Sequence, residues 1–518
     1  MEQSNKSKKK LGKVLLWIGG IVLGLFLLFN VVFWFLVQKK LPDVLANNNS
    51  DYAIMYTKLD VSLLSRNLRV TDVKVTPKDS LGSNKQGIFA TIKSLDINGI
   101  GLFKLAISDK IHVDEVVMKA PILHMYPVTK DSTKIKKEFE KIITLDELQI
   151  VDGGAFLYKT NAKDPYLKVE RYNFTLSDLL FDKQTQQQKV PFTYANYTFK
   201  ADSLHYVLNK FYTLKTKTLY TNDKSIEIED FKLLPNYNRA AFLRELPKEA
   251  DMFTVLIPKV ALQNLDWGYK NEDLYVNASQ LKLEKLNANI YRNKGLPDDT
   301  SIKPLYSKML RELPFFLDLK QVLIKDATIV YDEEFDLNKD FGRVSFSNFY
   351  ATISNIASGY KQKKLPKVTV DVKTKFYDVA NLNVNWNFDI LDTSDSFIIK
   401  GMLTNLPAQK VDKFIRPTFN VEATGTFKTL NFNYTGNNTK AWGDFAIDYD
   451  DLIITVLKND SKKKNKLLTA VGNLFVKSDT KEKKKNTAVS FDRLQDKGFF
   501  NLLWKTTAQG LKETLLII

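Results

Sequence analysis

The chain repeats one phrase: Ile-His-Val-Asp-Glu-Val-Val-Met at residues 111–118 returns as Ile-Thr-Leu-Asp-Glu-Leu-Gln-Ile at residues 143–150. A tyrosine follows each copy at the same distance, Tyr126 and Tyr158. Apolar residues alternate with polar ones on both sides of a two-residue spacer, and a period of two is typical of a strand with one buried face. The spacer shifts the alternation by one residue. We therefore predict a strand bent by a bulge, which keeps one apolar face along its whole length.

Looser copies of the phrase begin at Val255 and at Leu317, and each is also followed by a tyrosine, Tyr269 and Tyr331. A single strand unit of this kind cannot close a core, so repeated units are expected to stack into a long sheet. The composition agrees, because aromatic residues make up 12% of the chain, with 34 Phe and 22 Tyr, and such residues favour strands. No linker rich in Ser, Gly or Pro divides the 518 residues. We predict a mainly β protein with one elongated domain over residues 55–498.

Residues 14–37 are almost continuously apolar, and as a helix they would extend about 36 Å, enough to cross a bilayer. A cleaved signal peptide is the alternative. Its apolar region would be shorter and would end in small residues, whereas this one ends in the bulky run at residues 34–37. Lysines are more numerous before the segment than after it, which favours a cytoplasmic N-terminus and an exported remainder. We predict a basic cytoplasmic N-terminus at 1–13, a transmembrane helix at 14–37 and a hinge at 38–54.

The net charge of +17 is concentrated in the N-terminal lysines and in two lysine runs at residues 462–466 and 481–485. These two runs lie between strand-like stretches and are interpreted as hairpin tips that blunt the edges of a sheet. Contact with anionic lipid headgroups is the alternative. Nucleic acid is not expected as a partner, because no recognition helix or ribonucleoprotein-type aromatic motif accompanies the lysines.

A few short helices interrupt the strand pattern, at residues 133–141, 238–251 and 301–313. The last segment, 499–518, changes to a helical period and forms an amphipathic helix with one apolar stripe. The stripe consists of Phe500, Leu503, Trp504, Ala508, Leu511 and Leu515. This helix is interpreted as a cap on the last strand, with contact to a second membrane or a partner as the alternative.

The sequence contains no recognisable catalytic or metal-binding motif. It has no cysteine, and its three histidines, His112, His124 and His205, do not have the spacing of a metal site. Neither a phosphate-binding glycine loop nor a Gly-x-Ser-x-Gly nucleophile elbow is found. Adjacent acids such as Asp114 and Glu115 are expected to face solvent and do not make a glycosidase pair, since neighbours on a strand point to opposite faces. We predict that the protein is not an enzyme and uses no cofactor or metal.

The order of parts resembles a known family. The N-terminal apolar segment is followed by Leu-Asp-Val-Ser-Leu-Leu at 59–64, Leu-Arg-Val-Thr-Asp-Val-Lys-Val at 68–75, Val-Asp-Glu-Val at 113–116 and Ala-Pro-Ile-Leu at 120–123. Near the C-terminus stand Ile-Lys-Gly-Met-Leu at 399–403, Ala-Trp-Gly-Asp-Phe at 441–445 and Tyr-Asp-Asp-Leu at 449–452. Over nearly its whole length the chain resembles the AsmA-like proteins of double-membrane bacteria, relatives of the bridge-like lipid-transfer proteins.

This resemblance implies a curled, taco-like antiparallel β-groove in the periplasm, anchored in the inner membrane by the N-terminal helix. It also implies a function: the groove holds the acyl chains of phospholipids, and the protein contributes to phospholipid movement or to outer-membrane homeostasis in the cell envelope. The alternative function is a non-enzymatic envelope scaffold that assists outer-membrane protein assembly, with other envelope proteins as partners.

The residues support one part of this expectation independently. A long sheet with one apolar face and few helices must close on itself, dimerise or hold an apolar ligand. The predicted groove-lining residues are the apolar positions of the repeat, and packing as a sealed core is the alternative. They are Ile111, Val113, Val116, Met118, Leu145, Leu148, Ile150, Ile257, Val260, Leu262, Leu319, Val322 and Ile324.

Overall fold

The structure, a computed structural model, describes residues 52–62, 66–78, 85–101, 110–128, 142–335, 340–457 and 485–515. Strands account for 63% of these residues and helices for 11%, which confirms the prediction of a mainly β protein. The predicted transmembrane segment 14–37, the helix at 133–141 and most of the two lysine runs lie outside the described residues. Within the described ranges, the helices are too short or too polar to cross a bilayer.

The chain divides into two compact units. Unit 1 comprises the residues up to 208 together with 214–223, and unit 2 comprises 209–213 and 224–518. The single domain predicted for residues 55–498 stays a prediction, and each unit is described separately below. The first strand begins at Tyr52, a few residues before the predicted start of the β region.

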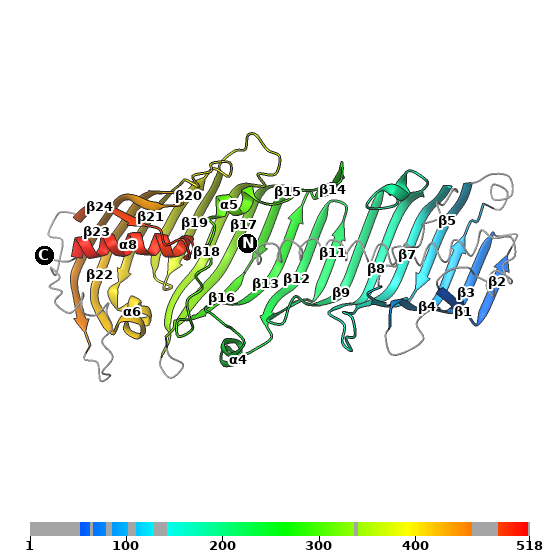
Figure 1. Ribbon diagram of the computed structural model, residues 1–518, viewed down its shortest axis with the longest axis horizontal. Coiled ribbons are helices and arrows are strands. Elements are labelled where there is room, and N and C mark those ends of the chain that lie inside the picture. The colour runs from blue at the N-terminus through cyan, green and yellow to red at the C-terminus, as the bar shows by residue number, and fades with distance from the viewer. Residues whose placement is uncertain are drawn as a thin grey trace. The chain divides into compact units, whose positions relative to one another are not determined.

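Unit 1 is a sheet of long strands (Figure 1). β1 (Tyr52–Met55) and β2 (Lys58–Ser62) pair with β3 (Asn67–Pro77), which pairs with β4 (Gly87–Asn98). β5 (Lys110–Lys119) and β6 (Ile122–Tyr126) both pair with β4 on one side and with β7 (Ile142–Leu157) on the other. β8 (Leu167–Phe181), the 3-10 turn η1 (Thr185–Gln187), β9 (Asn196–Val207) and β11 (Thr218–Asn222) complete the unit, and β10 (Tyr212–Thr216) has residues in both units.

The remaining strands of the sheet belong to unit 2. Its first strands are β12 (Ser225–Pro235), β13 (Met252–Gln263), β14 (Asp266–Lys270), β15 (Asp273–Glu284), β16 (Asn287–Asn293), β17 (Phe316–Glu334) and β18 (Gly342–Ala357). They are followed by β19 (Val368–Phe376), β20 (Ala380–Phe388), β21 (Phe397–Pro407), β22 (Val421–Gly436), β23 (Lys440–Val456) and β24 (Lys485–Asp492). The helices are α4 (Arg239–Arg244), α5 (Tyr306–Arg311), η2 (Ala408–Val411), α6 (Asp412–Phe419) and α8 (Phe499–Leu515). α4, α5 and α8 lie in predicted helical segments, whereas α6 lies in a stretch predicted as strand.

The prediction of a purely antiparallel sheet is wrong at two places. β5 and β6 run parallel to β7, and in the same way β15 and β16 run parallel to β17. In each case two short strands pair antiparallel with one earlier strand: β5 and β6 with β4, and β15 and β16 with β13. The same two strands pair parallel with the long strand that follows them in the chain, β7 or β17. The chain therefore crosses over before β7 and before β17, as parallel neighbours require. The same motif occurs once in each unit, so the sheet is mixed in both units.

The prediction that both halves of the repeat keep one apolar face is confirmed, but the ladder between the two copies shows no register shift of the kind that a bulge produces. Val113 pairs with Leu145 and Glu115 with Glu147, while the register omits the residues between them. In unit 2, the register between β12 and β13 likewise omits Asp230 and Pro258. Asp230 has a φ of 52°, a left-handed conformation that Asp and Asn tolerate better than most residues. The omitted residue lets the apolar side chains before and after the spacer keep to one face.

The apolar face of unit 1 is closed to solvent. Its side chains form one contiguous cluster in which each exposes 9% of its surface or less. The cluster includes the predicted groove residues of both repeat copies, from Ile111 to Met118 and from Leu145 to Ile150. Burial of this many aliphatic side chains, at roughly 25 cal/mol per Å² of apolar surface, is the main source of stability for the unit.

α8 lies across the strands at the C-terminal end of unit 2 and contacts β23 and β24 (Figure 1). It packs through Phe499, Leu502, Thr506, Gly510, Thr514 and Leu515. This face matches the predicted apolar stripe only in part: Leu515 is buried and Leu503 and Leu511 pack against the core. Phe500 and Trp504, also predicted, are 67% and 44% exposed. The polar residues can be buried because their hydroxyls donate to carbonyls of the helix itself, as Thr506 does to the carbonyl oxygen of Leu502 at 2.8 Å.

Gly510 allows the close approach of α8 to the sheet. A Cβ atom at this position would lie 2.4 Å from Cγ of Phe445. We expect Gly510→Ala to destabilise unit 2 by about 1–3 kcal/mol, because overpacking outweighs the gain in helix propensity. Gly498→Ala is the matched control, since a Cβ there meets no atom within 4 Å. Urea unfolding of the two variants tests this, and a Gly510→Ala protein as stable as the wild type would contradict the observed packing.

Candidate functional site

Two rows of apolar residues run across the strands of unit 2. Residues that pair directly in a ladder point to the same face of a sheet, so the register defines each row. The first row is Ile226, Leu262, Leu281, Val322, Ile353, Val370, Trp386, Ile399 and Tyr434. The second is Ile228, Val260, Leu283, Ile324, Ala351, Val372, Val384, Gly401, Phe432 and Phe445. We call the surface that carries these rows the unit 2 apolar face.

The opposite face of the same strands is polar. One row there is Glu227, Ala261, Lys282, Leu323, Thr352, Asp371, Asn385, Lys400 and Asn433. Glu229, Lys259, Glu284 and Lys325 form the next row over β12–β17, with alternating charges, and Tyr350, Lys373, Asn383, Met402 and Asn431 follow over β18–β22. Alternation of apolar and polar rows makes the sheet two-faced.

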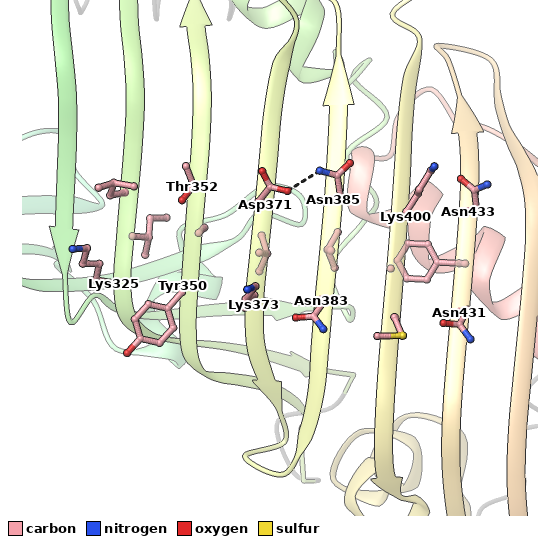
Figure 2. Close-up of a pocket in the computed structure, with 18 residues that line it drawn as sticks. Lys325, Tyr350, Thr352, Asp371, Lys373, Asn383, Asn385, Lys400, Asn431 and Asn433 are labelled. Atoms are coloured by element: carbon pink, nitrogen blue, oxygen red, sulfur yellow. Dashed lines mark hydrogen bonds between the residues drawn. The ribbon is translucent and has the colours of Figure 1, made fainter.

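A pocket of about 930 Å³ spans β17 to β22. Figure 2 shows its polar side chains in two lines across the strands, with Asn385 donating to Asp371 at 2.7 Å. The lining contains both polar rows and the apolar row between them, but not the next apolar row, that of Val370 and Trp386. The pocket therefore opens on the polar face, and Ile324, Val372 and Val384 contribute their backbone to its floor. The pocket is thus distinct from the unit 2 apolar face.

Solvent exposure varies along the unit 2 apolar face. From β12 to β20 most side chains of the two rows, such as Leu281, Ile353 and Val384, are only partly buried. At the other end the rows are closed under α8, where Ile399 is 2% exposed and Phe445 is fully buried. The accessible part of the face is therefore the part over β12–β20.

Aromatic residues mark the boundary between the two parts. The ring of Phe499, at the start of α8, stacks on Trp386 with centroids 4.5 Å apart and an angle of 19°. Tyr306 of α5 packs edge-on against both rings. The indole N–H of Trp386 is buried and has no hydrogen-bond partner among the described residues. A buried donor without an acceptor costs about 1–3 kcal/mol, so an acceptor supplied by a ligand would stabilise this position.

A network of charged residues fixes one end of the strands of unit 2. Asp332 of β17 is completely buried and accepts hydrogen bonds from Arg239 at 2.5 Å, from Arg343 at 2.7 and 3.0 Å and from Asn289 at 3.2 Å. Burial alone would raise the pKa of Asp332, but the hydrogen bonds from Arg343, Asn289 and Arg239 outweigh it and hold the pKa below its ordinary value. Because the arginines occupy both carboxylate oxygens, this network is structural rather than catalytic.

The predicted groove residues fall into two environments. The seven in unit 1 are buried in its closed cluster, each 3% exposed or less. In unit 2, Ile257 and Val322 are each 6% exposed, and Val260, Leu262, Leu319 and Ile324 are partly buried. Val260, Leu262, Val322 and Ile324 belong to the rows of the unit 2 apolar face. Their role in lipid binding stays a prediction.

Sequence reasoning missed the continuation of this face over β19 and β20. Val370, Val372, Val384 and Trp386 do not belong to a copy of the repeat phrase. The signal that could have found them is the strict alternation of Val-Thr-Val-Asp-Val at 368–372 and Asn-Val-Asn-Trp at 383–386.

Comparison of the chain with known protein families and with curated proteins finds no match.

Proposed function

We propose that the unit 2 apolar face binds the acyl chains of phospholipids. The observation that carries this proposal is the pair of uninterrupted apolar rows, partly accessible over β12–β20. Soluble proteins rarely leave apolar surface of this extent without an occupant. Six strand spacings of about 4.8 Å give roughly 29 Å from β12 to β20. One leaflet of a bilayer is about 15 Å thick, so this face is long enough for an acyl chain.

Trp386 supports an amphiphilic ligand rather than a pure hydrocarbon. Its indole N–H needs an acceptor and lies next to the closed end of the face. An ester or phosphate oxygen would provide one, while the acyl chains lie along the rows that begin there. Tryptophan commonly occupies such a boundary, because one edge of its ring is polar and the rest is apolar.

We further propose the setting in which this binding operates. The apolar segment 14–37 and the resemblance to AsmA-like proteins favour a chain anchored in the inner membrane of a double-membrane bacterium, with the β region in the periplasm as an elongated, curled groove. The protein would act without catalysis, by holding or transferring phospholipids between membranes and thereby contributing to outer-membrane homeostasis.

Site-specific crosslinking in cells tests the proposal. A photoreactive amino acid at Leu281 or Val384, on the apolar face, should yield phospholipid adducts detectable by mass spectrometry of the purified full-length chain. The matched controls are Lys282 and Asn383, neighbours on the same strands that point to the polar face and should yield few adducts. Equal labelling at all four positions, or no lipid at any of them, would refute acyl-chain binding. Adducts with another envelope protein at Leu281 and Val384 would instead favour a scaffold.

A further inference from the structure

Three side chains with metal-ligating atoms converge on the polar face of unit 1. They are His112 and Asp114 of β5 and Asp146 of β7, and their ligand atoms all lie within 4.8 Å of one another. Nε2 of His112 is 3.2 Å from Oδ1 of Asp114 and 3.7 Å from Oδ2 of Asp146. The side chains are between 29% and 58% exposed, so an ion can reach them from solvent.

The repeat itself brings these residues together. β5 and β7 pair in parallel with the two copies of the phrase in register, so that each residue lies beside its repeat equivalent. Glu115 therefore pairs with Glu147, and the spacer aspartates, Asp114 and Asp146, lie close to each other on neighbouring strands. Like charges side by side on a sheet are destabilising. A cation between the strands would remove this repulsion.

The hydrogen bonds of His112 orient one ring nitrogen toward the carboxylates. Nδ1 lies 2.9 Å from Oγ1 of Thr144, and this hydroxyl donates to the carbonyl oxygen of Ile111 at 3.5 Å. With Nδ1 engaged by this hydroxyl, Nε2 is the ring nitrogen that lies beside the carboxylates of Asp114 and Asp146 and can coordinate an ion there. Histidines that bind metals almost always donate their other ring N–H in this way.

Asp114 is also held in place by a neighbour. Nη2 of Arg66 lies 3.5 Å from Oδ2 of Asp114, which leaves Oδ1, the oxygen closer to His112, directed at the cluster. Contacts of this kind orient a carboxylate ligand and fix its coordinating oxygen. One guanidinium does not balance the charge of both aspartates.

We propose that His112, Asp114 and Asp146 form a binding site for a divalent transition-metal ion of the zinc type. The separations of 3.2 and 3.7 Å agree with a tetrahedral ion whose bonds are about 2.0–2.2 Å, for which ligand atoms lie roughly 3.4 Å apart. One nitrogen and two oxygen donors suit Zn²⁺ better than Mg²⁺ or Ca²⁺, which prefer oxygen alone. The bound ion would join β5 to β7, and the remaining position would hold water. This site is independent of lipid binding by unit 2 and revises the expectation that the protein binds no metal.

Metal titration of the full-length protein in detergent micelles, after treatment with EDTA and dialysis, tests the site. Isothermal titration with ZnCl2 should show one ion per chain with micromolar affinity. His112→Gln and Asp146→Asn should each weaken binding at least tenfold, and Thr144→Val should weaken it about tenfold without removing a ligand. His124→Gln is the control, because Nδ1 of His124 contacts the hydroxyl of Tyr158 instead of a carboxylate, and it should leave the affinity unchanged.

Two further measurements keep the result interpretable. Circular dichroism of every variant separates loss of the site from loss of the fold. The wild type loaded with Co²⁺ should show the intense visible absorption bands of a tetrahedral site, and these bands should disappear in His112→Gln. Absence of binding in the folded wild type would overturn the proposal, and so would equal Zn²⁺ affinity in His112→Gln and Asp146→Asn.

Discussion

Val116→Asp is expected to unfold unit 1, whereas Ile324→Asp should leave unit 2 folded and remove most of its bound lipid. Val116 is 2% exposed and lies in a closed cluster beside Ile97 and Leu148. A carboxylate there has no partner and no water, which costs more than about 4 kcal/mol. Ile324 occupies the equivalent kind of position in the other unit but is only partly buried, so a carboxylate can remain hydrated.

The comparison needs a readout for each unit. Hydrogen exchange with peptide resolution should show loss of protection in β5 and β7 for Val116→Asp, and native protection across β13 to β20 for Ile324→Asp. Phospholipid that copurifies with the full-length chain should fall several-fold in Ile324→Asp. Leu323→Asp is the matched control, because Leu323 lies on the polar face one residue away and the substitution should change neither property.

Other outcomes would be equally informative. If Ile324→Asp unfolds unit 2 as completely as Val116→Asp unfolds unit 1, the unit 2 apolar face is a sealed core and lipid binding by this face is wrong. If Ile324→Asp is folded and retains its lipid while Leu323→Asp loses it, the ligand lies on the polar face, where the pocket between β17 and β22 opens.

The strand content and the single apolar face of the repeat strands could be predicted from the sequence because both depend on local order. In β5 and β7 the apolar positions before and after the spacer reach one face because one residue of each strand is left out of the ladder at the spacer. The direction of pairing could not be predicted. The phrase specifies which face of β7 is apolar but says nothing about its neighbour, and β5 pairs with β7 in parallel because the chain crosses over between them.

The packing of α8 shows a different limit. The apolar stripe through Phe500 and Trp504 is the obvious candidate for burial, yet the sheet accepts the face that contains Gly510. Shape decides the outcome, because the helix can approach Phe445 closely only where it has no Cβ. Hydrophobicity read along one segment cannot reveal the shape of the surface against which that segment packs.

Residues distant in sequence set a third limit. Arg239, at the start of α4, and Asp332 of β17 are 93 positions apart, and the packing of α4 beside β16 and β17 brings them together. In the structure β17 extends to Glu334, which is 6% exposed and accepts hydrogen bonds from the Tyr291 hydroxyl and the Asn293 amide. Buried acids of this kind depend on partners that no local pattern contains.

Asp332→Asn should destabilise unit 2 by about 3 kcal/mol at neutral pH, the lower end of the cost of removing one partner from a buried ion pair. The lower end applies because Arg239 and Arg343 are 33% and 42% exposed and can be partly hydrated once the carboxylate is gone. Asp371→Asn is the control, since Asp371 is exposed and its neighbour Asn385 can bond an amide as well. Urea unfolding at pH 7 measures both changes.

The same pair of variants also predicts a pH dependence. The pKa of Asp332 is lower in the folded protein than its ordinary value, so the ionised carboxylate binds fewer protons than its unfolded counterpart. Its contribution to stability is present above the unfolded pKa, about 3.9, and is lost as the pH falls through the folded pKa. The wild type should therefore lose its advantage over Asp332→Asn progressively below about pH 5, while Asp371→Asn follows the wild type throughout. A constant difference between wild type and Asp332→Asn down to pH 2 would mean that the buried carboxylate does not carry the charge that orders Arg239 and Arg343.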